Sequence, residues 1–143
     1  MYHVLLPLDG DEDRALAQVE YVAAQPGAAE EIEAILLFVF TGGEEDTVPQ
    51  ELRQFKSATR VGSVRRATEH LEEAGVDVTV TDGSGDAAAD IIATAQKHDV
   101  DEIVMGGRKR SPAGKAIFGS VTQSVIRSTD LPVVVTGSGT RAR

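Results

Sequence analysis

Hydrophobic residues along the chain form five short, nearly continuous apolar runs. They occupy residues 4–8, 32–40, 76–80, 103–105 and 131–136. Runs of this length and composition are typical of strands that are buried on both faces of a parallel sheet. The third run alternates with polar residues more than the others do, and this alternation predicts that it lies at an edge of the sheet.

The segments between these runs carry apolar residues at helical spacing. Four helices are predicted, and they begin after the turn at residues 9–11, at a capping box near Thr47, after the cap Asp86, and at Val121. The second is predicted to end at Gly75, because glycine readily adopts the left-handed conformation that stops a helix. The positions expected to face the sheet are Leu16, Val19, Val22 and Ala23 in the first helix and Ala88, Ile91, Ile92 and Ala95 in the third.

The strict alternation of strand and helix predicts an α/β fold. Such a chain forms an open, doubly wound parallel sheet with helices on both faces. With 143 residues, we expect a single domain over residues 1–143, in which residues 137–143 form a flexible polar tail.

The charge of the chain narrows the choice of partners. Its formal net charge is -9 and its sequence pI is about 4.7. Because Lys and Arg contacts to phosphates dominate nucleic-acid affinity, this charge argues against a nucleic-acid partner. The acidic, lysine-poor composition indicates a salt-loving host such as a halophilic archaeon, although an ordinary acidic cytosolic protein would carry charge of the same sign.

Other features of the composition exclude whole classes of chemistry. The chain has no cysteine, which excludes disulfides, cysteine-ligated clusters and thiol catalysis. No spacing of His, Asp and Glu resembles a transition-metal site. The first residues show no charged leader followed by an apolar run, and no apolar stretch reaches 18 residues. We therefore expect a soluble, cytoplasmic protein without a membrane partner.

The stretch at residues 106–121 contrasts with this acidic background. It contains no acidic residue, and its four cationic residues are Arg108, Lys109, Arg110 and Lys115. Glycines let backbone N–H groups approach phosphate oxygens, and Gly119 and Ser120 open a helix whose dipole favours an anion. The stretch is predicted to bind phosphate. Two interpretations that involve no ligand stay open. The stretch could be a solvated basic loop, or Ser120 could serve only as the cap of a capping box that ends at Gln123.

The Walker A motif, a familiar phosphate-binding pattern, does not fit this stretch. The residue after Gly114-Lys115 is Ala116, which has no hydroxyl group for Mg²⁺. In addition, Lys109 stands where the first glycine of the motif belongs.

The Rossmann fingerprint matches residues 83–88 by its letters. However, the acidic pair Asp101-Glu102 begins the following strand, whereas the acid that binds ribose belongs at a strand's carboxyl end. A glycine turn followed by the helix cap Asp86 is the favoured interpretation.

Met105 and Gly106 end a predicted strand, and nine residues separate position 109 from Gly119 and Ser120. This arrangement resembles the universal stress protein (UspA-like) family, whose nucleotide-binding members show G-x-x-G, nine residues, and then G-[ST]. The resemblance spans essentially the whole chain, and it also includes residues 7–9, 38–39, 85–86 and 131–135.

The resemblance implies a five-stranded sheet in the order 3-2-1-4-5, as in the adenine nucleotide alpha hydrolase-like fold. Ligands would bind where the strand order reverses, between the first and fourth strands. The implied ligand is ATP, or another adenine nucleotide, with Mg²⁺. The implied nucleotide-binding residues are Leu8, Asp9, Val39, Met105, Gly106, Lys109, Gly119, Ser120 and Val121. Among them, Asp9 and Val39 would contact the ribose or adenine, and Asp9 could also help to hold Mg²⁺.

The resemblance further implies a cytoplasmic stress-response regulator or sensor that forms a homodimer through its fifth strand, residues 131–135. An apolar edge strand of this kind needs covering. Little catalysis is expected, because no His lies beside a nucleophile and no paired carboxylates lie near the loop. Weak ATP hydrolysis or self-phosphorylation at Ser111 or Ser120 would be the upper limit.

One position departs from the family pattern, because Lys109 stands where its second glycine is expected. A lysine could block the phosphates by filling the space that glycine leaves, or it could bind a phosphate as a point charge. Two functions therefore remain open: a nucleotide-binding stress protein, and a dimeric interaction protein of the same fold that binds no nucleotide.

Overall fold

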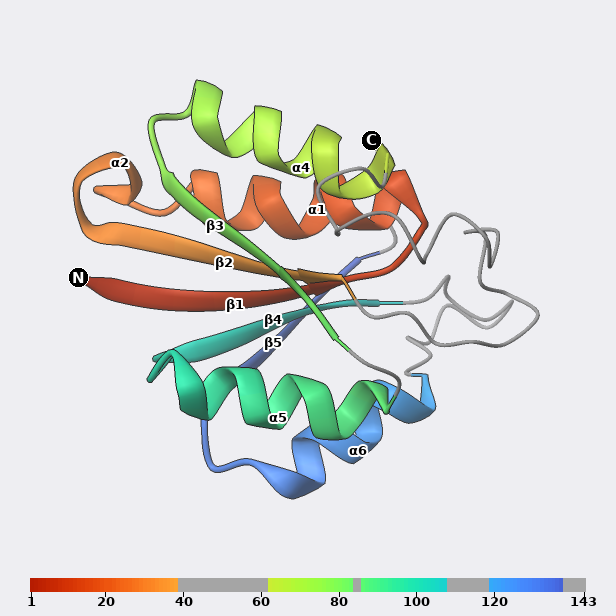
Figure 1. Cartoon of the computed structure of the whole chain (residues 1–143). Coiled ribbons are helices and arrows are strands. Elements are labelled where there is room, and N and C mark those ends of the chain that lie inside the picture. Colours follow the sequence, from red (N-terminus) through yellow and green to blue (C-terminus); the bar gives the residue numbers. More distant parts are fainter. Residues whose placement is uncertain (39–61, 84–85, 108–118, 138–143) are drawn as a thin grey trace.

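The computed structural model describes residues 1–38, 62–83, 86–107 and 119–137. Its centre is a five-stranded parallel sheet in the order β3-β2-β1-β4-β5 (Figure 1). The strands are β1 (Tyr2–Leu8), β2 (Ile32–Phe38), β3 (Asp77–Asp82), β4 (Glu102–Gly106) and β5 (Val133–Thr136). The predicted α/β class and the predicted strand order are both confirmed, including the position of the third strand at an edge.

Helices cover both faces of this sheet. They are α1 (Glu12–Ala23), the single turn α2 (Ala28–Glu31), α4 (Gly62–Glu73), α5 (Ala87–Lys97) and α6 (Ser120–Ser128). Figure 1 shows α1 and α4 on one face and α5 and α6 on the other. The predicted start of the second helix near Thr47 lies outside the described residues.

The central strands are apolar on both sides because two separate cores need them. Along β1, Val4, Leu6 and Leu8 belong to the core under α1 and α4, whereas Leu5 belongs to the core under α5 and α6. Side chains of a strand alternate between the faces, so a strand covered on both faces has no polar positions left. This is the physical reason for the continuous apolar runs.

The predicted turn at residues 9–11, the predicted cap Asp86 and the predicted helix stop Gly75 are confirmed. Asp11 caps α1 by accepting a hydrogen bond from the Arg14 amide at 3.0 Å, and Asp86 caps α5 by accepting one from the Ala89 amide at 3.1 Å. After α4, Gly75 adopts a φ of 81°, the left-handed conformation expected of a helix stop.

The ladder between β1 and β4 is short. It pairs Val4 with Glu102 and Leu5 with Ile103, whereas the ladder between β1 and β2 continues to Leu8. Pro7 has no N–H group to donate to the neighbouring strand, and it stands at the next position where a ladder bond would form. The two central strands therefore separate before their carboxyl ends.

The side chain of Gln18 bridges this separation. It comes from α1, is 1% exposed, and its Nε2 donates hydrogen bonds to the Pro7 carbonyl at 2.8 Å and the Val104 carbonyl at 2.9 Å. Both carbonyl groups would otherwise lack a partner in a buried environment, which is costly. A buried polar residue on the inner face of α1 thus substitutes for the missing ladder.

Replacing Gln18→Leu tests this role. Leucine has a similar size but no N–H group, so the Pro7 and Val104 carbonyls would lose their partner. We expect the free energy of unfolding to fall by about 2–4 kcal/mol. Urea denaturation followed by circular dichroism measures this change.

Gln25→Leu is the matched control, because the half-buried Gln25 donates one hydrogen bond to the Tyr21 carbonyl at 2.9 Å. Its expected cost is below about 1 kcal/mol. Equal costs for the two variants would contradict the bridging role of Gln18.

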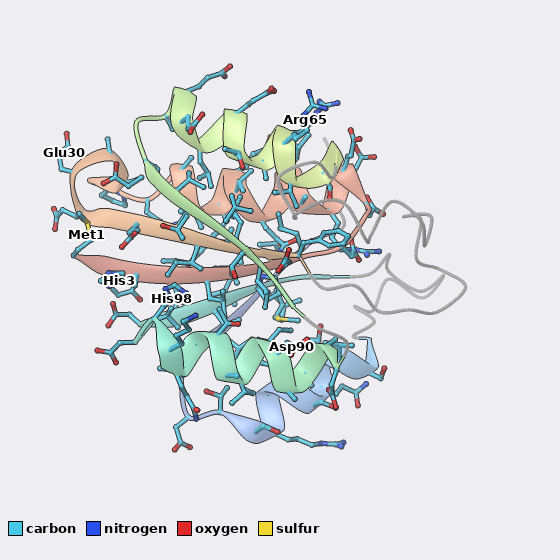
Figure 2. All side chains as sticks on the ribbon, in the orientation of Figure 1. Met1, His3, Glu30, Arg65, Asp90 and His98 are labelled. Atoms are coloured by element: carbon cyan, nitrogen blue, oxygen red, sulfur yellow. The ribbon has the colours of Figure 1, made fainter. Side chains whose placement is uncertain are left out.

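Acidic side chains lie at the amino ends of the strands, at the other end of the sheet from the separation of β1 and β4. Met1, His3 and His98 lie there (Figure 2), and Nε2 of His3 lies 3.0 Å from Oε1 of Glu33. Glu102 is 8% exposed in the same region. Burial is the main cause that raises the pKa of its carboxyl group, the nearby charge of Asp101 raises the pKa further, and a hydrogen bond with the Tyr2 side chain lowers it in part.

The raised pKa of Glu102 makes stability depend on pH in a defined direction. The stabilising contribution of a group with a raised pKa is complete below its unfolded pKa and is lost as the pH rises through the folded pKa. At pH 7, Glu102→Gln is therefore expected to unfold at a higher temperature than the natural protein, and this advantage should shrink as the pH falls toward about 4.

Thermal melts between pH 4 and pH 7 test this expectation, with Glu69→Gln on the exposed side of α4 as the control. A pH-independent effect of Glu102→Gln would show that burial of the charge is not the cause.

Candidate functional site

A cleft of about 130 Å³, partly open to solvent, lies at the carboxyl ends of the strands, where β1 and β4 separate. This is the point at which the strand order reverses, and open α/β sheets bind their ligands at such points. The cleft is lined by Pro7, Leu8, Asp9, Arg14, Gln18, Ala87, Ile91, Met105, Gly106, Gly119, Ser120, Val121 and Thr122. It therefore combines the ends of two strands with residues of α1, α5 and α6.

Asp9 follows β1 directly and is fixed by several contacts. Its Oδ1 accepts a hydrogen bond from the Asp11 amide at 2.9 Å, and its Oδ2 pairs with Nη1 of Arg14. Its backbone carbonyl accepts a hydrogen bond from the hydroxyl group of the buried Ser63 on α4 at 2.5 Å. The carboxylate is nevertheless 45% exposed, so it faces the cleft with acceptor capacity to spare.

Arg14 crosses from α1 to the end of β4. Its Nε donates a hydrogen bond to the Gly107 carbonyl at 3.0 Å, and its side chain is 23% exposed. A Cβ atom placed on Gly106 would lie 2.4 Å from Cγ and 2.6 Å from Cδ of Arg14. Position 106 is therefore glycine because the arginine side chain passes directly over it.

The amino end of α6 forms another wall of the cleft. Gly119 is its N-cap, with a φ of -71° and a ψ of 167°, and makes no side-chain capping bond. Ser120 is already the first helical residue and is exposed, so the interpretation of Ser120 as the cap of a capping box is wrong. The first N–H groups of a helix have no partner within it, and together with the helix dipole they favour an anion.

The structure brings together most of the predicted nucleotide-binding residues. The residues that line the cleft as predicted are Leu8, Asp9, Met105, Gly106, Gly119, Ser120 and Val121. Val39 and Lys109 lie outside the described residues, as do the other cationic residues of the predicted phosphate loop. Phosphate binding by this loop therefore stays a prediction. The structure describes the residues at its two ends, and these line the cleft.

Sequence reasoning missed Arg14 and Gln18. Both occupy α1, whose helical spacing predicts only apolar positions facing the sheet, and yet Gln18 is buried and Arg14 lies in the cleft. A signal was available for Gln18, since a polar residue next to Val19 and four before Val22 falls within the apolar stripe of the helix. Nothing in the local sequence predicts the partner of Arg14, the Gly107 carbonyl directly after β4.

The described residues contain no group of three or more His, Cys, Asp or Glu side chains that could hold a metal ion. Within the same residues, no helix is long and apolar enough to cross a membrane. The cleft offers hydrogen-bond acceptors at Asp9, the N–H groups at the amino end of α6, and apolar surface from Leu8 and Met105. This set is suited to binding a ligand with polar, anionic and flat apolar parts.

Comparison with known proteins places this geometry in a family. The model of the universal stress protein family matches residues 1–137. A universal stress protein from Mycolicibacterium smegmatis is 32% identical over 76 residues, a match that covers 52% of this chain and 58% of that relative. The aligned part is thus little more than half the length of this curated relative.

Solved structures show the same fold over nearly the whole chain. The structure of a universal stress protein from Archaeoglobus fulgidus superimposes with a TM-score of 0.72 and 25% identity, covering 95% of this chain and 98% of the other. A universal stress protein from Archaeoglobus fulgidus in complex with dAMP has a TM-score of 0.68 and 18% identity, with coverage of 95% and 98%. By its match to the family model over residues 1–137, the chain belongs to the universal stress protein family.

Proposed function

We propose that this protein binds an adenine nucleotide, with ATP as the first candidate, and acts as a cytoplasmic stress-response regulator or sensor. The observation that carries the proposal is the amino end of α6, which opens into a cleft at the reversal point of the sheet. A related structure with the same fold binds dAMP.

The ligand would divide its groups among the parts of the cleft. Its phosphates would accept hydrogen bonds from the N–H groups at Gly119 and Ser120, and its base and ribose would lie against Leu8, Met105 and Asp9. Mg²⁺ would arrive bound to the phosphates of ATP. Since the positively charged guanidinium of Arg14 is paired with Asp9, this carboxylate is a poor candidate for a strong metal contact.

Ser120→Asp tests the phosphate position. A carboxylate at the first position of α6 is compatible with the helix dipole, so the thermal stability should not fall. The same charge would repel the phosphates, and we expect the ATP dissociation constant to rise at least about tenfold, a cost of roughly 1.4 kcal/mol. Isothermal titration calorimetry with Mg-ATP, in salt at which the protein is folded, measures the affinity.

Ser120→Asn is the matched control, since it adds polar bulk without charge and should bind within about threefold of the natural protein. Equal affinities of the Asp and Asn variants would contradict phosphate binding at α6. No binding by the natural protein at millimolar ATP would overturn the proposed function.

A second candidate function is a dimeric interaction protein that binds no nucleotide, and the observation that favours it is Lys109 at an expected glycine. Lys109→Gly separates the two in the same titrations. A large gain in ATP affinity would support this second function, and a loss would support Lys109 as a phosphate contact.

We also propose a homodimer that forms through β5. This strand ends the sheet, and its residues Val133–Thr136 are only half-buried in the single chain. The Ile103 amide donates a hydrogen bond to the Pro132 carbonyl. The backbone N–H and C=O groups of the even-numbered residues of β5 therefore point toward β4, and the N–H group of Val135 points away from the sheet. An exposed apolar edge of this kind invites pairing with a second chain.

Val135→Pro is expected to abolish the dimer, because it removes an outward N–H group while the ladder to β4 stays intact. Size-exclusion chromatography with light scattering reports the mass. Val80→Pro is the matched control: on β3, the Gly83 amide donates to Phe38, so the Val80 amide also points outward, but at the other edge. This control should stay dimeric, and a dimer that survives Val135→Pro and is lost with Val80→Pro would contradict the proposal.

A further inference from the structure

Arg14 and Asp9 are the charged residues among the described residues that line the cleft, and they are paired with each other. Among the described residues, the Asp11 amide donates to Oδ1 of Asp9 and Arg14 donates to Oδ2. Each oxygen of an ionised carboxylate can accept about two hydrogen bonds, so further acceptor positions remain on the exposed part of the group.

The guanidinium group of Arg14 is itself held in place. Its Nε is used by the Gly107 carbonyl at 3.0 Å, and its Nη2 lies 3.7 Å from an oxygen of Asp11. Its methylene groups fill the space over Gly106. The orientation of Asp9 is thus fixed through Arg14 by the end of β4 and by the turn before α1.

We infer that Arg14 is a positioning residue that sets which chemical groups Asp9 can recognise. The inference rests on the proposed nucleotide binding and extends it. The nearby guanidinium compensates the negative charge of Asp9 and repels a metal cation, while the carboxylate repels phosphate. Such a pair best binds a neutral hydrogen-bond donor. In an adenine nucleotide, the neutral donors are the hydroxyl groups of the ribose and the amino group of the base.

The same contacts argue against Arg14 as a direct phosphate ligand. A phosphate bound to the remaining N–H groups of the guanidinium would lie close to the Asp9 carboxylate, which would repel it. The free N–H groups of α6 provide an anion site without this penalty. Loss of Arg14 should therefore weaken recognition of the nucleoside part, regardless of the number of phosphates.

The experiment compares adenosine, AMP and ATP as ligands in calorimetric titrations. Arg14→Met keeps an unbranched side chain over Gly106 but removes the charge and the donors. We expect it to raise the dissociation constants of all three ligands by the same factor, roughly tenfold. The double variant with Asp9→Ala should bind no more weakly than Asp9→Ala alone, because Arg14 acts through Asp9.

Arg66→Met is the matched control. Arg66 forms an ion pair with Glu12 at 3.1 Å between α4 and α1, outside the cleft, and its loss should leave all three affinities unchanged. Circular dichroism and urea denaturation establish that each variant is folded under the conditions of the titrations.

The outcomes separate this inference from the proposed function. A loss with Arg14→Met that grows from adenosine to ATP would mark Arg14 as a phosphate ligand and overturn the inference, and so would additive losses in the double variant. If the natural protein binds none of the three ligands, the proposed function is overturned, and the role of Arg14 in recognition is overturned with it.

Discussion

The separation of β1 from β4 is the constraint on which the rest of the structure depends. Parallel strands that run side by side leave no room for a ligand, and Pro7 ends the ladder because it has no N–H group. Where the ladder is open, two buried carbonyl groups would lack hydrogen-bond partners, which would lower stability. The side-chain amide of Gln18 donates to both of them. The cleft therefore exists at little expense in stability because α1 supplies the missing donors.

The opening also explains the residues next to it. Because β4 lies apart from β1 at this end, a second side chain of α1, that of Arg14, can reach the Gly107 carbonyl. This path passes over Gly106, where any side chain would collide with the arginine methylene groups. Stability and recognition thus rest on the same helix. Gln18 bridges the two strands where they separate, and Arg14 fixes the carboxylate that lines the cleft.

The sequence predicted those features whose cause is local. The apolar run of β1 reflects burial on both faces, Asp11 and Asp86 cap helices through bonds to residues three positions away, and Gly75 needs only its own left-handed conformation. The roles of Arg14 and Gln18 depend on β4, more than eighty residues further along the chain, and no local pattern encodes that contact. The open interpretation of Ser120 as a cap is wrong because a capping-box pattern fixes residue types but not the residue at which the helix begins.

The two ends of the cleft differ in whether their charge is compensated by a neighbouring group. This difference limits the kind of ligand that fits. At Asp9 the negative charge is compensated by Arg14, so a neutral hydrogen-bond donor is favoured there. At Gly119 the N–H groups of α6 carry a partial positive charge that the described side chains do not compensate with a capping bond. A small anion such as phosphate would satisfy only the second end, and a neutral sugar only the first. A molecule that joins a hydroxyl-rich part to an anionic part, as a nucleotide does, satisfies both at once.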